Sequence, residues 1–227
     1  MLGTLLALCI AGGLTGYCLA EEAPTTDDFY WSREKPSGVE IASSLSDPSL
    51  NFFDVGDLSY YSLYLVQQLL GSLSGATGIA IDRNLKSSSL SIIHDTKVFY
   101  RLKNEKDRFR ALGISDVVIE SLEKRAADET TKCVTMTHSD ENGDIKFTIV
   151  LLSEKFHDCL IAGLLDSFGL HHTRDITLRT LSSACVLYEG RRRGLRDRQS
   201  LTRETPRLRE VCFAKALEKP NEIGSAQ

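Results

Sequence analysis

The stretch from Ile145 to His171 constrains the fold of this chain more than any other part of the sequence. Its first eight residues are mostly β-branched, aliphatic or aromatic, with a single charge, which predicts a strand ending at Leu152. Apolar residues then recur at positions 156, 160, 161, 164, 165 and 168, the spacing of one helix face, and Gly169 marks the helix end. We therefore expect a buried helix, preceded by a strand, at the centre of the domain.

A second strand is expected just before the first, over Lys132 to His138. The two are joined by the segment Asp140 to Asp144, which contains Asn-Gly. This dipeptide is a strong turn signal, because both central residues of a type I′ turn need positive φ. The acidic turn lacks the alternating ligands and the distant Glu of a calcium loop, so we expect a plain turn. We therefore expect the two strands to form a hairpin that leads into the central helix.

The remaining periodic segments predict several more helices and two short strands. Helices are expected at 58–73, 104–112, 115–127 and 178–188, and a last helix that opens at 202–206 and reaches position 217. Pro206 would then lie in the first turn of that last helix, where proline is tolerated. Short strands at 79–81 and 90–93 would form a hairpin or a split pair at a sheet edge. The fold class predicted is α+β, a small mixed sheet packed by several helices.

Length and composition are those of one folded domain with tails. The chain has 227 residues, of which 42% are apolar, enough for one sizeable core. The formal net charge of -4 gives the molecule no overall basic field, so we expect no nucleic-acid partner. We divide the chain into an apolar leader at 1–20, a flexible arm at 21–51, a single α+β domain at 52–218 and a disordered tail at 219–227.

The first twenty residues are rich in Leu and Gly and end in a small residue, Ala20, before two glutamates. This pattern predicts a cleaved secretory signal peptide, with an uncleaved anchor as the alternative. We therefore expect an exported protein, periplasmic or secreted, with no membrane span after signal cleavage.

The arm that follows carries three prolines and many Ser, Thr and Asp residues without helical or strand periodicity. Its aromatic cluster, Phe29-Tyr30-Trp31, is the exception. We expect this cluster to dock on the surface of the domain rather than to bind a partner.

Four cysteines remain after removal of the leader: Cys133, Cys159, Cys185 and Cys212. An even number in an oxidising compartment favours disulfides, and four cysteines allow three connectivities. Our hypothesis pairs Cys133 with Cys159, strand to central helix, and Cys185 with Cys212, between two late helices. The alternative is four free buried thiols. No C-x-x-C pair is present, so a zinc ribbon is not expected.

Two blocks in the second half of the chain resemble a known family. The helix reads Cys159-Leu160 at its start and Phe168-Gly169-Leu170 at its end, and Leu187-Tyr188 is later followed by arginines and Gly194-Leu195. This order is similar to the DUF2927 family of exported bacterial proteins of unknown function, over roughly Leu58 to Leu217. In that family the helix typically reads C-L-x-E-E-x-x-Q-A-L-G-L, and the later block L-Y-D-P-R.

The same helix is similar to the H-E-x-x-H-x-L-G-L helix of zincin metallopeptidases, so the resemblance implies a zincin-like architecture. Aligned on Gly169, the two zinc-binding His positions fall on Ala162 and Asp166, and the Glu position falls on Gly163. Alanine and glycine offer no side-chain ligand, and a catalytic zinc needs about three protein ligands. We therefore expect a degenerate metal site at these three positions, with no catalytic residue, no metal and no cofactor.

A second partial match begins at His157-Asp158, but Ile161 stands where the second histidine would be. The alternative function that we keep open is a metal-dependent, peptidase-like hydrolase whose ligands come from elsewhere. Its candidate ligands are His138, His157, Asp158, Asp166, His171 and His172.

The function predicted is that of an exported, non-catalytic protein with a binding or envelope-associated role. Its partner would be an unknown protein or an envelope component. Two surfaces are candidates for contact: a groove where Ala162 and Gly163 leave room beside Asp166, and the basic loop Arg191–Arg198, which would meet anionic polymers or lipid head groups. The alternative for the loop is a solvated helix end whose arginines lie near carbonyl groups.

Overall fold

The structure is a computed structural model of the chain, and it describes residues 24–33, 39–56, 58–83, 89–128, 130–154, 157–171 and 177–216. The expected leader at 1–20 and tail at 219–227 lie outside these residues. The strands are β1 (Trp31–Arg33), β2 (Glu40–Ala42), β3 (Ser44–Leu45), β4 (Ser49–Gly56), β5 (Ala80–Arg83), β6 (Leu90–His94), β7 (Cys133–Ser139) and β8 (Asp144–Leu152). The helices are the short 3-10 helix η1 (Thr26–Asp28), α1 (Tyr60–Thr77), α2 (Val98–Asn104), α3 (Lys106–Ala111), α4 (Asp116–Arg125), α5 (His157–Ser167), α6 (Leu178–Arg192) and α7 (Arg198–Ala216).

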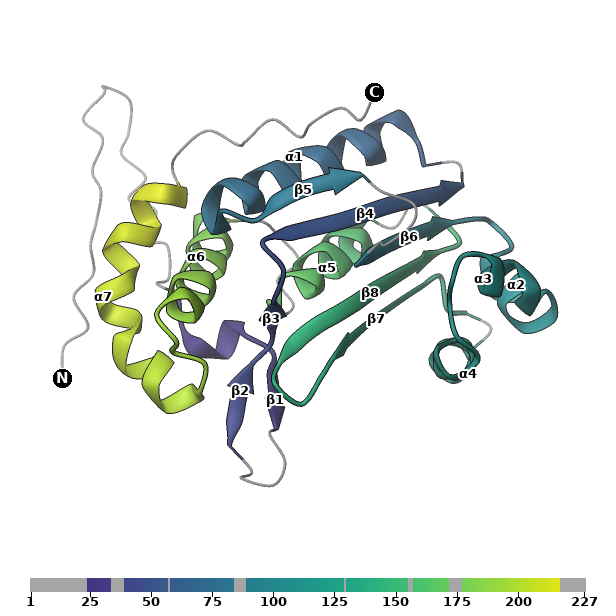
Figure 1. Cartoon of the computed structure of the whole chain (residues 1–227). Helices are drawn as coiled ribbons and strands as arrows, with labels where there is room; N and C mark the ends of the chain where they lie inside the picture. Colours follow the sequence, from purple (N-terminus) through teal and green to yellow (C-terminus); the bar gives the residue numbers. More distant parts are fainter. Residues whose placement is uncertain are drawn as a thin grey trace.

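Six strands form one mixed sheet, with β1 and β2 as a separate antiparallel ribbon beside it (Figure 1). Strands β8, β6, β4 and β5 lie side by side in that order and run parallel. Strand β3 adds a short parallel pair at the start of β8, and β7 pairs with β8 antiparallel. This mixed sheet packed by helices confirms the predicted α+β fold class. The zincin-like architecture remains a prediction.

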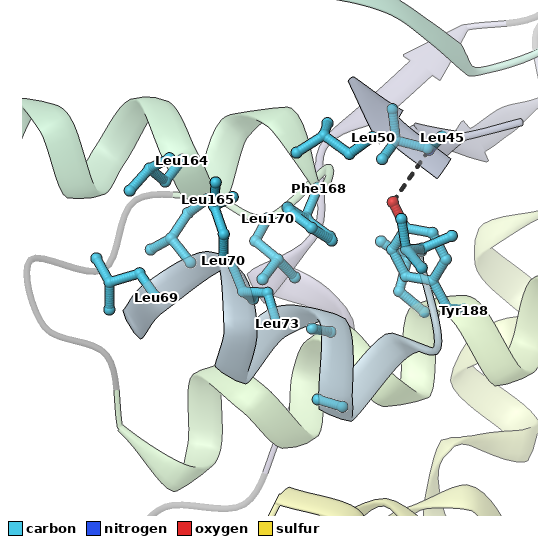
Figure 2. Close-up of a cluster of buried hydrophobic side chains, with 14 of the residues drawn as sticks. Leu45, Leu50, Leu69, Leu70, Leu73, Leu164, Leu165, Phe168, Leu170 and Tyr188 are labelled. Atoms are coloured by element: carbon cyan, nitrogen blue, oxygen red, sulfur yellow. Dashed lines mark hydrogen bonds between the residues drawn. The ribbon is translucent and has the colours of Figure 1, made fainter. Parts of the chain in front are cut away.

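The two faces of the sheet bury two separate apolar clusters. Along β6, Leu90 and Ile92 belong to the larger cluster, which α1, α5, α6 and α7 cover, whereas Ile93 belongs to the cluster under α2 and α4. This alternation is the two-residue period of a strand buried on both faces. Figure 2 shows leucines of α1 packed against Leu164 and Leu165 of α5, with the Tyr188 hydroxyl accepting a hydrogen bond from the Leu45 amide at 3.1 Å.

The predicted hairpin is confirmed, with β7 and β8 paired from Cys133 opposite Leu152 onward. Gly143 has a φ of 74°, the left-handed conformation that its turn requires. The Asp140 carboxylate accepts the amides of Asn142 and Asp144, each at 2.9 Å, and so organises the turn.

The predicted central helix is also confirmed as α5, which packs on β8 and β7. Its end is fixed by Gly169, which has a φ of 79°. Directly beyond it, the Gly169 carbonyl accepts the Tyr30 amide at 2.9 Å, and Leu170 forms a β-bridge with Phe29. The end of the central helix therefore anchors a segment that lies far away in the sequence.

The expected flexible arm at 21–51 is wrong for its described residues, which form η1, β1, β2, β3 and the first part of β4. Polar composition and prolines indicated a linker, but the segment contributes apolar side chains to the core, among them Phe29, which is 1% exposed, and Leu50. Asp28 holds it in place by accepting the Arg179 guanidinium at 2.8 Å and the Ser183 hydroxyl at 2.7 Å. The predicted docking of the aromatic cluster is confirmed.

The two short strands predicted near 79–81 and 90–93 exist as β5 and β6, but they do not pair with each other. Strand β4 lies between them and is parallel to both. The prediction of a hairpin was wrong because it did not include β4. The first three residues of β4, 49–51, were assigned to the flexible arm, so no strand was expected between β5 and β6. Of these two strands only β5 lies at an edge of the sheet, because β6 is flanked by β4 and β8. This arrangement corresponds to the split pair that was the alternative.

The last helix also differs from the prediction. Helix α7 begins at Arg198, four residues earlier than expected, because the Asp197 carboxylate accepts the Ser200 amide at 2.8 Å and caps the first turn. Pro206 therefore lies in the helix interior rather than in its first turn. Helix α6 begins as predicted, with the Thr177 hydroxyl accepting the Thr180 amide at 3.3 Å.

The cysteines pair as predicted. Cys133 of β7 and Cys159 of α5 lie at disulfide-bonding distance, with Cα atoms 6.3 Å apart, and Cys185 of α6 pairs in the same way with Cys212 of α7, at 5.4 Å. The first pair joins strand β7 of the sheet to the central helix α5, and the second joins helix α6 to helix α7. Within the described ranges, no helix combines the length and apolar character that a membrane crossing needs.

Candidate functional site

Helix α5 carries the three positions at which the sequence predicted a degenerate metal site. Gly163 lies where the helix packs closely on the sheet, since a Cβ atom there would be 2.2 Å from Cγ2 of Val150. The expectation that small residues leave a groove is therefore wrong at Gly163, because Val150 fills the space. Ala162 is partly buried one residue earlier. Asp166, one turn further along, is the position that reaches a pocket.

The Asp166 carboxylate is 3% exposed and has defined hydrogen-bond donors. The Tyr30 hydroxyl donates to its Oδ1 atom at 2.9 Å, and the Thr135 hydroxyl donates to its Oδ2 atom at 3.2 Å. A carboxylate away from water needs such donors, because an unsatisfied buried charge is strongly unfavourable. Two distant parts of the chain, at Tyr30 and Thr135, thus converge on the carboxylate of a third.

A pocket of about 220 Å³ opens around this carboxylate. Strand β7 supplies one wall through Thr135, Thr137 and Ser139, whose alternate positions place them on one face of the strand, while Val134 faces the opposite cluster. The full lining consists of Tyr30, Trp31, Ser43, Arg125, Thr135, Thr137, Ser139 and Asp166. Five of these eight side chains end in a hydroxyl group, so the pocket offers many groups that both donate and accept.

A guanidinium and an indole complete the pocket. Arg125, at the end of α4, is exposed and donates to the Thr135 carbonyl at 3.2 Å. The indole N–H of Trp31 donates to the Thr26 carbonyl at 3.1 Å, and the Arg198 guanidinium carbon lies 5.4 Å from the centre of the Trp31 ring. The Trp31 ring is thereby fixed from two sides.

Tyr30 remains protonated in this setting. Burial raises the pKa of its phenol above the ordinary value of 10.0, and the neighbouring Asp166 carboxylate raises the pKa further through its charge and its hydrogen bond. Arg125 opposes this shift, as the smallest contribution. The phenol is therefore a hydrogen-bond donor to Asp166, not a base.

This shift predicts how stability responds to alkaline pH. An unfolded chain loses the Tyr30 proton near pH 10.0, whereas the folded chain keeps it. The stabilisation is therefore fully present below pH 10.0 and is lost as pH rises toward the higher pKa of the folded state. We expect Tyr30→Phe to reduce this alkaline loss in urea unfolding measured across that range. Tyr61→Phe, at an exposed position, is the control, and an equal pH dependence of all three proteins would contradict the prediction.

The histidines predicted as alternative metal ligands do not gather at this pocket in the described part of the chain. His138 is exposed on β7 and stacks on Phe147, with ring centres 5.3 Å apart. His171 is exposed and stacks on Tyr30 at 4.7 Å, and Asp158 is exposed in the first turn of α5. The side chain of His157 and the whole of His172 lie outside the described residues.

Among the described side chains, no three of His, Cys, Asp or Glu lie close enough together to hold a metal ion. Helix α5 brings the Asp166 carboxylate to the pocket. One turn earlier, where a zincin has its first zinc-binding histidine, this helix has Ala162, whose side chain cannot bind a metal.

The basic loop at 191–198 makes contacts within the protein. Arg191 donates to Ser44 and to Asp144, and Arg192 donates to Glu189 and to the Thr77 carbonyl at the end of α1. Further along, the Arg198 guanidinium pairs with the carboxylates of Asp27 and Glu40, at 2.9 Å and 3.0 Å. These contacts favour the alternative interpretation of the loop, in which its arginines bind the carbonyl groups at helix ends and nearby carboxylates rather than an external anion.

The chain matches no protein-family model, no curated protein and no solved structure. The similarity to the DUF2927 family therefore remains a prediction that rests on the two sequence blocks quoted above.

Proposed function

We propose that the protein is an exported, non-catalytic binding protein that holds a small hydroxyl-rich ligand, such as one sugar unit of an envelope polymer, in the pocket at Asp166. The observation that carries the proposal is the organisation of the Asp166 carboxylate by Tyr30 and Thr135 inside a pocket lined with hydroxyl groups. A fixed carboxylate accepts from ligand hydroxyls, and the Arg125 guanidinium donates to them.

The dimensions of the pocket fit such a ligand. Pockets for drug-sized molecules measure roughly 300 to 1,000 Å³, and this one, at about 220 Å³, is smaller. It has room for a single small unit rather than for an extended molecule. The Trp31 ring supplies an apolar surface beside the polar groups, which suits the alternating apolar and hydroxyl faces of a sugar ring.

Two further observations support a binding protein of an oxidising compartment. The cysteine pairs at disulfide-bonding distance are typical of exported proteins, as is the apolar leader. The positions that would hold zinc in a zincin carry Ala162 and Asp166, so helix α5 offers one carboxylate where that chemistry needs two imidazoles.

Isothermal titration of the full chain with N-acetylglucosamine, glucose and chitotriose tests the proposal. We expect at least one of these sugars to bind, and Asp166→Asn to weaken that binding at least about tenfold, because the amide loses the charge-assisted bonds. Asp158→Asn removes an exposed carboxylate from the other end of α5 and is the matched control, expected to bind like the wild type. Failure of all three sugars, or equal binding by Asp166→Asn, would contradict the proposal.

Elemental analysis separates this function from the alternative of a metal-dependent hydrolase. We expect the purified protein to contain well under one zinc per chain after dialysis, because helix α5 presents one oxygen ligand instead of the usual ligand pair. Stoichiometric zinc that survives dialysis would overturn the non-catalytic assignment and direct attention to His157 and His172.

A further inference from the structure

Strand β7 lies at the outer edge of the sheet. It pairs with β8 on one side, and no described strand lies on its other side (Figure 1). Residues of an antiparallel pair alternate between those that exchange main-chain hydrogen bonds and those that do not. The Lys132 carbonyl accepts the Ser153 amide at 2.9 Å, which shows where this alternation begins. Met136 therefore bonds to β8, whereas the main-chain groups of Thr135 and Thr137 point away from the sheet.

Most of these outward main-chain groups are unpaired. The Thr135 carbonyl accepts the Arg125 guanidinium at 3.2 Å. In the part of the chain that the structure describes, the Thr135 amide and the amide and carbonyl of Thr137 have no hydrogen-bond partner. Both threonines are partly exposed, so these groups can be reached from outside. Such a row of free donors and acceptors is a template for another strand.

The two outer edges of the sheet differ in how they are protected. Strand β5, at one edge, has four residues, and two of them are the exposed and charged Asp82 and Arg83. Strand β7 has seven residues, none of which is a proline, a lysine, an arginine or an acidic residue. Its register shift lies at its end, between His138 and Ser139. Charges, prolines, short length and bulges are the usual protection of an edge, so β7 is open to pairing before its last residues.

A second copy of the same strand is complementary to this edge. Antiparallel pairing centred on Met136 places Thr135 opposite Thr137 of the partner subunit, and the two residues then exchange both main-chain hydrogen bonds. Threonine pairs across antiparallel strands are favourable, and no like charges meet, because β7 carries none of the charged residues named above. The Thr135 carbonyl has two lone pairs and can accept this second donor beside Arg125.

We propose that two copies of the chain associate through β7, which joins their sheets into one. The interface uses the same strand of both copies, as a two-fold symmetric dimer requires. The symmetry axis of such a pair is perpendicular to the sheet, so the two Asp166 pockets, whose walls include Thr135 and Thr137, lie on the same face beside the junction. The dimer does not depend on sugar binding. Only the capture of two neighbouring units of a polymer by its two pockets rests on the proposed function.

Sedimentation velocity of the full chain over a series of concentrations tests the proposal. One pair of short strands buries little surface, so we expect a weak dimer, with a dissociation constant on the order of 10 μM. Thr137→Pro removes an amide that points away from β8, so the fold of each copy keeps its strand pairing while the dimer loses a donor from each copy. We expect this variant to dimerise at least about tenfold more weakly. Thr137→Val is the matched control: it loses the same side-chain hydrogen bond to Thr148 but keeps the amide, and should dimerise like the wild type.

Amide hydrogen exchange of the wild type gives a second measurement that needs no variant. The amides of Thr135 and Thr137 should become protected as the protein concentration rises, whereas the Met136 amide, which bonds to β8, should be protected at every concentration. If Thr137→Pro does not fold, this exchange decides alone. A wild type that stays monomeric about tenfold above the expected dissociation constant, dimerisation of Thr137→Pro as tight as that of Thr137→Val, or exchange at Thr135 and Thr137 that does not depend on concentration overturns the proposal.

Discussion

Replacing Cys185 and Cys212 together by alanine is expected to lower the free energy of unfolding by about 3.5 kcal/mol or more, enough to threaten folding altogether. The two cysteines are 27 residues apart, and a cross-link that closes a loop of this length restricts the unfolded chain by about that amount. Both side chains are 0% exposed between α6 and α7, so the lost sulfur packing adds to the effect.

The other cysteine pair provides a matched control. Cys133 and Cys159 are 26 residues apart, so the loop term is nearly the same, but both are only partly buried. Urea unfolding should therefore show a smaller loss for the Cys133/Cys159 double alanine variant. Alkylation followed by mass measurement gives the independent check, and four thiols reactive in the unfolded chain without reductant would remove the basis of both predictions.

Gly169→Ala is expected to cost about 3 kcal/mol or more and to disrupt the Asp166 pocket. Gly169 has a φ of 79°, and a Cβ atom would lie 1.9 Å from the Ser43 carbonyl oxygen. Backbone rather than a flexible side chain occupies that space, so the segment must move. Because the Gly169 carbonyl also accepts the Tyr30 amide, the movement would displace the Tyr30 hydroxyl from Asp166.

Gly194→Ala separates the conformational cost from the clash. Gly194 has a similar φ of 76°, but nothing lies within 4 Å of a Cβ atom at that position. We expect this variant to lose only about 1 kcal/mol, the cost of an alanine in the left-handed region. Thermal or urea unfolding of the two variants measures the difference, and equal losses would show that the contact between Gly169 and Ser43 is not tight.

The central part of the fold could be predicted from sequence because its signals are local. Turn chemistry at Gly143, the periodicity of α5 and the stop at Gly169 are each encoded within a few residues. The cysteine pairing also followed from this part, since one pair joins the predicted hairpin to the predicted helix.

The sheet order and the pocket could not be derived in the same way. Strand β4 is parallel to both of its neighbours, and such pairing leaves no turn signal between the strands. The pocket depends on a hydrogen bond between Tyr30 and Asp166, which are 136 residues apart. The aromatic cluster in a polar segment was the available signal for Tyr30.

The place of Tyr30 and Trp31 in the pocket wall has a consequence for the predicted cleavage of the leader. A signal peptidase that cuts after Ala20 would leave the wall complete, including the contact of the Pro24 carbonyl with Arg209 at 3.2 Å. A protease that trims the new amino terminus by about a dozen residues more would remove the donor to Asp166 while leaving the sheet and its helices covalently whole. Under the proposed function, trimming at this end would abolish ligand binding irreversibly.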